Sequence, residues 1–215
     1  MTEHVPRFRR APTDERRGLL IDATLRCLAA EGHAGISVRR IAREAGVSVG
    51  LVNHHFGSID ALIADAYRTL SLDITHSLHE EVARHAAPAS RLEAFLAASF
   101  SPRVLDRDLL SVWVVFWGLI RHSPAVHDAH EEGYSTYRAL VEQLLCDLAQ
   151  AEGFALPDPA LAAIALSAVL DGLWLEWCLN PATFSPQNGL AICRSWVAGL
   201  RLGAFAGVGM ASGGE

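Results

Sequence analysis

The sequence predicts an all-α protein, and three observations support that prediction. Apolar residues recur at spacings of three and four in most segments, as they do along one face of a helix. No segment alternates apolar and polar residues with the period of two that a half-buried strand would show. Serine, glycine and proline stand where one helical pattern stops and the next starts. We therefore expect helices joined by short breaks.

The chain should begin with a flexible basic arm, residues 1–12, which carries three arginines between two prolines. Thr13 can cap the first helix, which should continue to Gly32. One face of this helix carries an apolar stripe that should pack behind the next two helices. The stripe consists of Leu20, Ala23, Thr24, Cys27 and Leu28.

The stretch from Ser37 to Phe56 predicts two short helices joined by a tight turn. Ser37 can cap the first helix, whose apolar face lies opposite a face of arginines. Gly46 supplies a left-handed residue that ends this helix, and Ser48 can cap a second helix that reaches about His55. The result is a helix-turn-helix, a unit that places its second helix in a DNA major groove.

This stretch resembles the DNA-binding domain of the TetR family of bacterial transcriptional regulators. Farther on, FSPRVLDRDLLSVWVVFWGLIRHSP and DGLWLEWCLNP resemble the effector domain of its BetI-like branch, whose best-known member represses choline-to-betaine genes. The resemblance covers roughly residues 13–203, with Ile59 and His55 where the family usually has lysine and tyrosine. The matching motif residues are Ile41, Ala42, Ala45, Gly46, Val47, Ser48, His54, Phe56 and Leu62.

The helices after the motif should form a larger body. We expect a three-helix DNA-binding domain at 13–57, a helical ligand-binding and dimerisation domain at 58–204, and a disordered glycine-rich tail at 205–215. The helix at 106–121 is apolar nearly all round, so it should be buried inside the body. The expected helices are 58–84, 91–100, 106–121, 124–153, 160–179 and 187–204.

The second helix of the motif carries side chains that can read DNA bases. Asn53 can form two hydrogen bonds to an adenine edge, and Val49 or Leu51 can contact a thymine methyl group. Serine, arginine and histidine side chains around the motif are better placed to hold phosphates. The basic arm either reaches a neighbouring minor groove or is a solvated tail. The expected DNA-binding residues are Ser37, Arg39, Arg40, Ser48, Val49, Leu51, Asn53, His54 and His55.

Aromatic residues gather in two of the segments that resemble the effector domain. Aromatic faces beside a carboxylate can hold a quaternary ammonium ion through cation–π attraction. We therefore expect a choline-like or other cationic effector, although a neutral hydrophobic effector, or a plain tryptophan core, fits the same residues. The expected effector-binding residues are Trp113, Phe116, Trp117, Asp171, Trp174 and Trp177.

The last two expected helices differ from the others in composition. The first has many small residues, and the second repeats apolar residues at coiled-coil-like spacing. The TetR resemblance implies a homodimer that packs these helices as a four-helix bundle, while packing within one chain is the alternative. The repeating residues are Leu190, Cys193, Val197, Leu200 and Ala204.

Composition supports a regulator that acts on DNA in the cytoplasm. Residues 1–70 hold 10 arginines against 8 acids, and residues 71–215 hold 8 arginines against 16 acids, so only the front of the chain is basic. The longest apolar run, residues 112–120, is too short to span a membrane, and we expect no membrane partner. The scattered cysteines read as buried, reduced side chains. They are Cys27, Cys146, Cys178 and Cys193.

We also considered a small helical metal-dependent hydrolase. Histidine pairs at positions 76 and 79, and 127 and 130, share helix faces, but such pairs lack the third ligand that a zinc site needs. The sequence has no nucleophile elbow, zinc-protease motif or phosphate-binding loop. We therefore expect no catalytic residues, no metal and no cofactor, with an operator duplex, a small effector and a second copy of the chain as partners.

Overall fold

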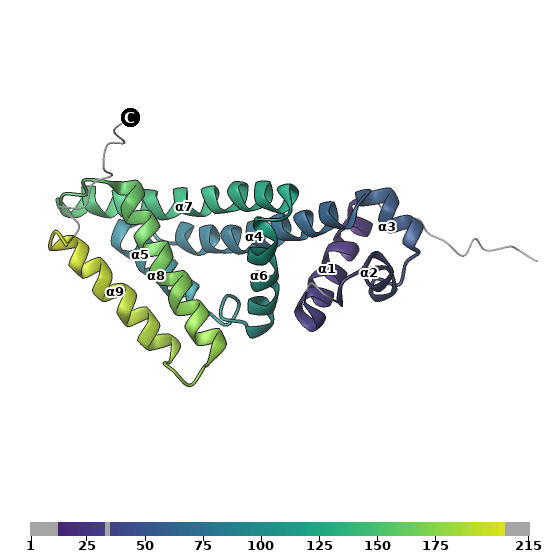
Figure 1. Cartoon of the computed structure of the whole chain (residues 1–215). Helices are drawn as coiled ribbons and strands as arrows, with labels where there is room; N and C mark the ends of the chain where they lie inside the picture. Colours follow the sequence, from purple (N-terminus) through teal and green to yellow (C-terminus); the bar gives the residue numbers. More distant parts are fainter. Residues whose placement is uncertain (1–12, 33–34, 205–215) are drawn as a thin grey trace, which may run out of the picture.

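The computed structural model describes residues 13–32 and 35–204, and this part of the chain forms nine α-helices (Figure 1). The expected basic arm at 1–12 and tail at 205–215 lie outside the described residues. The helices are α1 (Thr13–Glu31), α2 (Val38–Glu44), α3 (Val49–Phe56), α4 (Ile59–Ala83), α5 (Pro88–Ser99), α6 (Arg107–Ile120), α7 (Pro124–Glu152), α8 (Pro159–Leu179) and α9 (Pro186–Arg201).

The helix-turn-helix is confirmed as α2, a glycine turn and α3. The Ser37 hydroxyl accepts a hydrogen bond from the Arg40 backbone N–H at 3.2 Å, and Ser48 accepts one from Leu51 at 3.3 Å. Each serine therefore satisfies an N–H group that the first turn of a helix leaves unpaired. Gly46 has φ +67°, the left-handed conformation that glycine adopts without steric cost.

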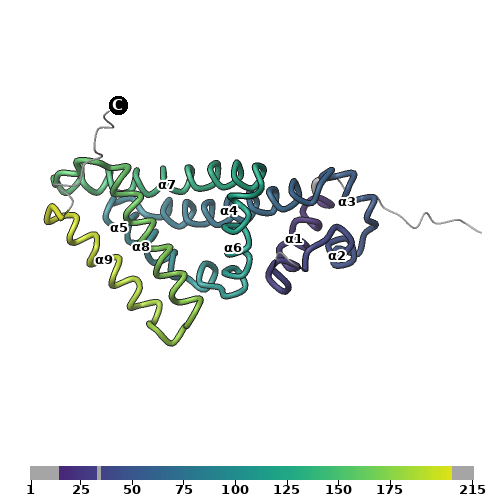
Figure 2. The backbone as a smooth tube through the Cα atoms, viewed as in Figure 1, coloured from purple at the N-terminus to yellow at the C-terminus, as the bar shows by residue number. Residues whose placement is uncertain are grey.

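Helix α4 joins the DNA-binding head to the body as one continuous helix (Figure 2). Its first half, including Leu62 and Tyr67, belongs to the hydrophobic core formed with α1, α2 and α3, to which α6 and α7 also contribute residues. Its second half, including Leu78 and Val82, belongs to the core of the body. The break between α3 and α4 falls at residues 57–58, and α4 itself contributes side chains to both cores.

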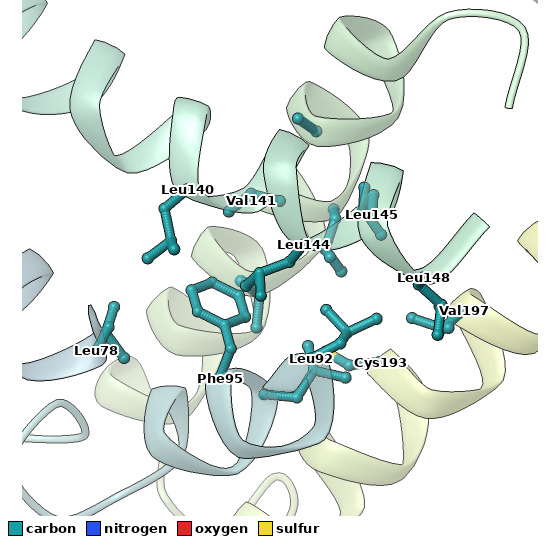
Figure 3. Packing of buried hydrophobic residues seen from close by; sticks show 14 of the residues in the cluster. Leu78, Leu92, Phe95, Leu140, Val141, Leu144, Leu145, Leu148, Cys193 and Val197 are labelled. Carbon is teal, nitrogen blue, oxygen red and sulfur yellow. The ribbon is translucent and has the colours of Figure 1, made fainter. Parts of the chain in front are cut away.

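The body core is made mainly of leucines from α5, α7 and α8, together with residues of α9 (Figure 3). Phe95 of α5 and Leu144 of α7 are fully buried there, and both face into the same cluster in Figure 3. Helix α7 has apolar residues repeating at three and four along its length, so one long face is turned to this core. Leu78 and Leu170 of this core also line the cavity described below.

The prediction that the 106–121 helix is buried on all sides was wrong. In α6 only Val112 and Phe116 are buried, while Val114 is 51% exposed and Trp117 is 36% exposed. Asp106 caps the helix by accepting a hydrogen bond from the Asp108 N–H at 2.8 Å. Helix α6 touches the rest of the chain through one stripe, and its apolar outer face made the sequence resemble a core helix.

Two predicted helix boundaries were also wrong. Helix α5 begins at Pro88, three residues before the expected start, because proline fits the first turn of a helix and was misread as a break. Helix α9 ends at Arg201, so Ala204 lies beyond it. The other predicted helices match the structure to within two residues.

The repeating apolar stripe of α9 packs inside its own chain. Cys193, Val197 and Leu200 are at most 3% exposed and belong to the body core, as Figure 3 shows for the first two. These residues therefore do not form the expected surface between two chains. The outer faces of α8 and α9 instead carry the exposed Ile164 and Ile192.

Helix α8 is long and apolar enough, by length and composition alone, to cross a membrane. The longest uninterrupted apolar run did not indicate this, because Asp171 and Glu176 divide α8. In this fold α8 packs against α7 on its inner side, where Leu166 and Leu170 join the body core. Its apolar composition is therefore explained by one core-facing side and one open side.

Candidate DNA interface and internal cavity

Helix α3 lies at one end of the molecule, at the far end from α9 (Figure 1). Val52 is buried and holds the helix on the head core, while Phe56 is half-buried against the same core. Asn53 is exposed, as are Val49 and the cap Ser48. The side chains expected to read bases therefore share an accessible face, although Leu51 is half-buried.

The residues expected to hold phosphates fall into two groups. Ser37, Ser48 and Arg39 are exposed, and His55 is half-buried. The His55 ring lies edge to face with that of His54, which is exposed and was expected on the base-reading face, with 5.5 Å between the ring centres. No described acid pairs with Arg39. Its guanidinium is therefore available to a phosphate.

Arg40 differs from the expectation, because its charge is held within the head. Its Nε donates to Glu31 at 2.8 Å and its Nη1 donates to Glu44 at 3.3 Å. Arg26 of α1 also donates to Glu44 at 3.0 Å. The side chain of Arg40 thus joins α1 to α2, and these two carboxylates neutralise the charge that a phosphate would otherwise meet.

A cavity of about 130 Å³ lies in the body between α4, α5, α6, α7 and α8. Its walls are mostly aromatic and aliphatic, and Asp171 is the one carboxylate among its described lining residues. Several hydroxyl groups complete the polar part of the wall. The lining residues are Tyr67, Ser71, Ile74, Thr75, Leu78, Ser99, Phe100, Val104, Trp113, Trp117, Gly133, Tyr134, Tyr137, Leu170, Asp171 and Trp174.

Asp171 accepts a short hydrogen bond from the Tyr134 hydroxyl. Burial raises the pKa of this carboxyl group, and the Tyr134 hydrogen bond and the nearby Arg138 charge act in the opposite direction. The Arg138 guanidinium lies over the Tyr134 ring, 4.3 Å from its centre. Tyr134 and Arg138 of α7 therefore partly compensate the negative charge of Asp171, and a cation in the cavity would stabilise that charge further.

Two tryptophans form one corner of the cavity. The rings of Trp117 on α6 and Trp174 on α8 meet edge to face, with centres 6.0 Å apart. Trp174 donates its indole N–H to the carbonyl of Val104 at 2.9 Å, which fixes the ring and leaves its face as the contact surface. Trp113, one turn before Trp117, also lines the cavity. These rings offer the electron-rich faces to which cations are attracted.

Two expected effector residues do not line the cavity. Phe116 is fully buried in the core that α6 shares with the head, where its ring centre lies 4.9 Å from that of Tyr67. Trp177 is half-buried against the body core. Phe116 directly precedes the lining residue Trp117, and Trp177 follows the lining residue Trp174 by three positions.

Comparison with known proteins agrees with this arrangement. Residues 20–66 match the tetR family of bacterial regulatory proteins, and residues 88–202 match the C-terminal domain of BetI-type transcriptional repressors. The chain belongs to the TetR family. Its C-terminal domain is of the BetI type, and the family consists of DNA-binding transcriptional regulators and not of enzymes.

Individual relatives cover most of the chain of this TetR-family regulator. The HTH-type transcriptional regulator BetI of Burkholderia thailandensis is 31% identical over 185 residues, which is 85% of this chain and 91% of the relative. A solved structure described as a transcriptional regulator of Pseudomonas aeruginosa PAO1 is 47% identical, with a TM-score of 0.87, and covers 93% of this chain and 97% of its own. A Saccharomonospora viridis regulator solved with choline is 22% identical, with a TM-score of 0.74 over 86% and 96% of the chains, and shows the fold alone.

Sequence reasoning missed the contribution of α7 to the cavity of the regulator. Tyr134 and Tyr137 of α7 line the cavity, although neither was among the expected effector-binding residues. The aromatic spacing of His130, Tyr134 and Tyr137 places three rings along one helix face, and this was the available signal. Tyr67 of α4 reaches the same region and hydrogen-bonds His130 Nδ1 at 2.8 Å.

The histidines considered as metal ligands have other neighbours in the regulator. His76 lies 3.2 Å from Glu80, and His127 lies 3.5 Å from Asp128. His79 interacts with the backbone carbonyl of Thr75 at 3.2 Å. Across the described ranges, no group of three or more His, Cys, Asp or Glu side chains is placed to hold a metal ion.

Proposed function

We propose that this TetR-family regulator represses transcription as a cytoplasmic homodimer and is released from DNA by a small cationic effector. The two copies of α3 would enter successive major grooves of a near-palindromic operator, with centres about one helical turn, roughly 34 Å, apart or slightly more. The exposed face of α3 supports this docking, as does Arg39, which pairs with no acid in the part of the chain that the structure describes. A second chain packing on the outer faces of α8 and α9 would supply the two-fold symmetry.

The observation that carries the effector proposal is the half-buried carboxylate of Asp171, the one carboxylate among the described residues that line a cavity whose remaining wall is aromatic, aliphatic or hydroxyl-bearing. A buried charge is costly unless another charge or hydrogen bonds compensate it. A cation would compensate Asp171, and its alkyl groups would contact the faces of Trp117 and Trp174. A quaternary ammonium ion suits this site because it needs no hydrogen-bond acceptors.

Cavity size favours a compact effector. About 130 Å³ is well below the roughly 300–1,000 Å³ of pockets that hold drug-sized ligands. A compound of choline size fits this volume better than a long acyl chain does. The S. viridis structural neighbour is described with choline bound, which is consistent with this choice without assigning choline to this regulator.

Release from DNA requires that the effector bind the two conformations of the regulator with different affinities. Helix α4 contributes to both the cavity wall and the core of the head, so a ligand that alters the cavity acts on a helix shared with the DNA-binding unit. We propose that the effector favours a tilt of α4 that changes the separation of the two copies of α3.

Titration of intrinsic tryptophan fluorescence tests the effector proposal. We expect choline or betaine aldehyde to change the emission, because Trp117 and Trp174 line the cavity, and Asp171→Asn to weaken that response. A polyamine and a neutral hydrophobic compound serve as comparisons. A response to the neutral compound alone would show an apolar pocket and would exclude the cation proposal.

Gel-shift measurements test the DNA proposal. The regulator should bind the DNA that flanks its own gene at nanomolar concentration and in a salt-dependent manner, and the active effector should reduce that binding. A symmetric footprint with two half-sites is expected. An asymmetric footprint made by a monomer would contradict the homodimer.

A further inference from the structure

Helices α4 and α7 approach each other closely between the head and the cavity, beside Gly133. A Cβ atom at Gly133 would overlap Oγ of Ser71, so any larger residue there would require Ser71 to move. Both residues also line the cavity. We call the contact between residues 67–71 of α4 and residues 130–134 of α7 the α4–α7 seam.

Two polar contacts cross the seam. The Tyr67 hydroxyl and His130 Nδ1 are 2.8 Å apart, and Arg68 donates from Nε to Glu132 Oε2 at 3.0 Å. The His130 ring also stacks on Tyr134 of the next turn, with ring centres 5.1 Å apart. A movement of this single turn of α7 would therefore reach α4 at two adjacent residues.

On the side of the head, the contacts continue to the recognition helix. Arg68 also donates to Asp65 at 3.3 Å, and Asp65 forms a second, short ion pair with Arg17 of α1. The Arg17 guanidinium lies over the ring of Phe56, 5.1 Å from its centre. Phe56 is the last residue of α3, so this chain of charges ends on the helix expected to read DNA.

On the side of the cavity, the same turn of α7 meets the proposed effector position. Tyr134 donates its hydroxyl to Asp171, and Glu132 is two residues away on the turn. A cation in the cavity would attract the carboxylate that accepts this hydrogen bond, and we expect Tyr134 to shift with it.

We propose that Glu132 is a positioning residue that couples the Tyr134–Asp171 hydrogen bond to the recognition helix through Arg68, Asp65 and Arg17. The proposal rests on the proposed function, because it assumes that the cavity regulates DNA binding. Loss of the Tyr134–Asp171 bond shifts the turn that holds Glu132, loosens Arg68 from it, and frees Arg17 to move with Phe56. The ligand-free arrangement is the one that binds DNA.

The exposure of the participating charges limits the size of this coupling. Glu132 is 62% exposed and Asp65 only 16% exposed, so the contact between Arg68 and Glu132 is the weakest step. Exposed ion pairs contribute little, and we therefore expect a change of about two- to fivefold in operator affinity. An effect of this size is measurable when wild-type and variant proteins are titrated side by side.

The test uses variants of the full chain without any effector. An operator is first selected from random duplex DNA by the wild-type protein, and its affinity is measured for Tyr134→Phe, Glu132→Gln and the double variant. Coupling predicts that each single change lowers affinity about two- to fivefold and that the double variant is no worse than either. The control is a second double variant that combines Tyr134→Phe with Glu81→Gln, a change that removes an exposed ion pair to Arg84 away from the head. In this control the effects of the two substitutions on operator affinity should add.

Hydrogen exchange supplies a readout that a general loss of stability would not reproduce. Tyr134→Phe should speed amide exchange in α1 and α3, and adding Glu132→Gln should cause no further change there. Additive losses of affinity in the double variant, or unchanged affinity and exchange in Tyr134→Phe, would overturn the proposal. Because no effector is added, failure of choline to bind would contradict the proposed function without affecting this result.

Discussion

The different surroundings of two neighbouring arginines lead to a sharp prediction about DNA binding. Arg39 is exposed and unpaired among the described residues, whereas Arg40 donates to the carboxylates of Glu31 and Glu44. We therefore expect Arg39→Gln to remove a phosphate contact. Arg40→Gln should instead loosen the packing of α2 on α1 and lower the melting temperature.

The expected magnitude follows from counterion release. Each lost phosphate contact reduces the slope of log affinity against log salt by about 0.9, so a dimer that loses one contact per chain changes by about 1.8. When the salt concentration rises from 50 to 200 mM, the operator affinity of the wild type should therefore fall by about 12-fold more than that of Arg39→Gln. Arg40→Gln should keep the wild-type slope, even if its affinity falls at every salt concentration.

Fluorescence anisotropy with a labelled operator at four or more salt concentrations measures both slopes. Arg43→Gln offers a matched comparison, because Arg43 is exposed on the same helix and is likewise unpaired among the described residues. An unchanged slope for Arg39→Gln would show that this residue does not touch phosphate. A slope reduced by Arg40→Gln would show that DNA binding takes Arg40 away from its two carboxylates.

Three further predictions concern base reading, the cavity carboxylate and the dimer. Asn53→Ala should weaken operator binding by about 1–3 kcal/mol while leaving random DNA nearly unaffected, and equal losses on both duplexes would move Asn53 to the phosphate-binding group. Burial raises the pKa of Asp171, so the carboxyl group becomes neutral as the pH falls through that raised pKa. Choline affinity should then drop by up to about tenfold per pH unit, whereas the contribution of Asp171 to the stability of the ligand-free protein should increase. Fluorescence titrations measure the first trend, and thermal melts of wild type and Asp171→Asn measure the second. Ile164→Glu should place like charges across the proposed two-fold interface and yield a folded monomer with weakened operator binding, as measured by light scattering, and an intact dimer would place the interface elsewhere.

Local signals in the sequence were sufficient to predict the helix-turn-helix. Ser37, Gly46 and Ser48 each determine backbone geometry within a few residues, and all three behave in the structure as expected. Proline was harder to interpret, because it either interrupts a helix or begins one. The start of α5 at Pro88 shows the second behaviour, which depends on what the preceding residues can pack against.

The cavity was only partly predictable, because its lining depends on how each helix is rotated about its axis. On α6, Trp113 and Trp117 face the cavity while Phe116, one residue away from Trp117, is buried in the other core. Neighbouring residues on a helix point about 100° apart, and composition alone cannot fix that rotation. The ion pairs of Arg40 could not be predicted for a related reason, because Glu31 comes close to it only when α1 and α2 pack together, with Glu44 one turn away on α2.

Helix α8 explains why a hydrophobic pattern can predict a helix and still leave its function open. Its inner side gives Leu166 to the core and Asp171 to the cavity, while Ile164 and Ala168 remain on the open side. A helix that is apolar on every side has no polar face to indicate solvent, so its sequence is equally consistent with a core helix, a membrane helix and an interface helix. Of the two acids on α8, Glu176 is exposed to solvent, whereas Asp171 lines the cavity. A charge on such a helix is retained at a cost, and in this fold it lies where a cation in the cavity would compensate it.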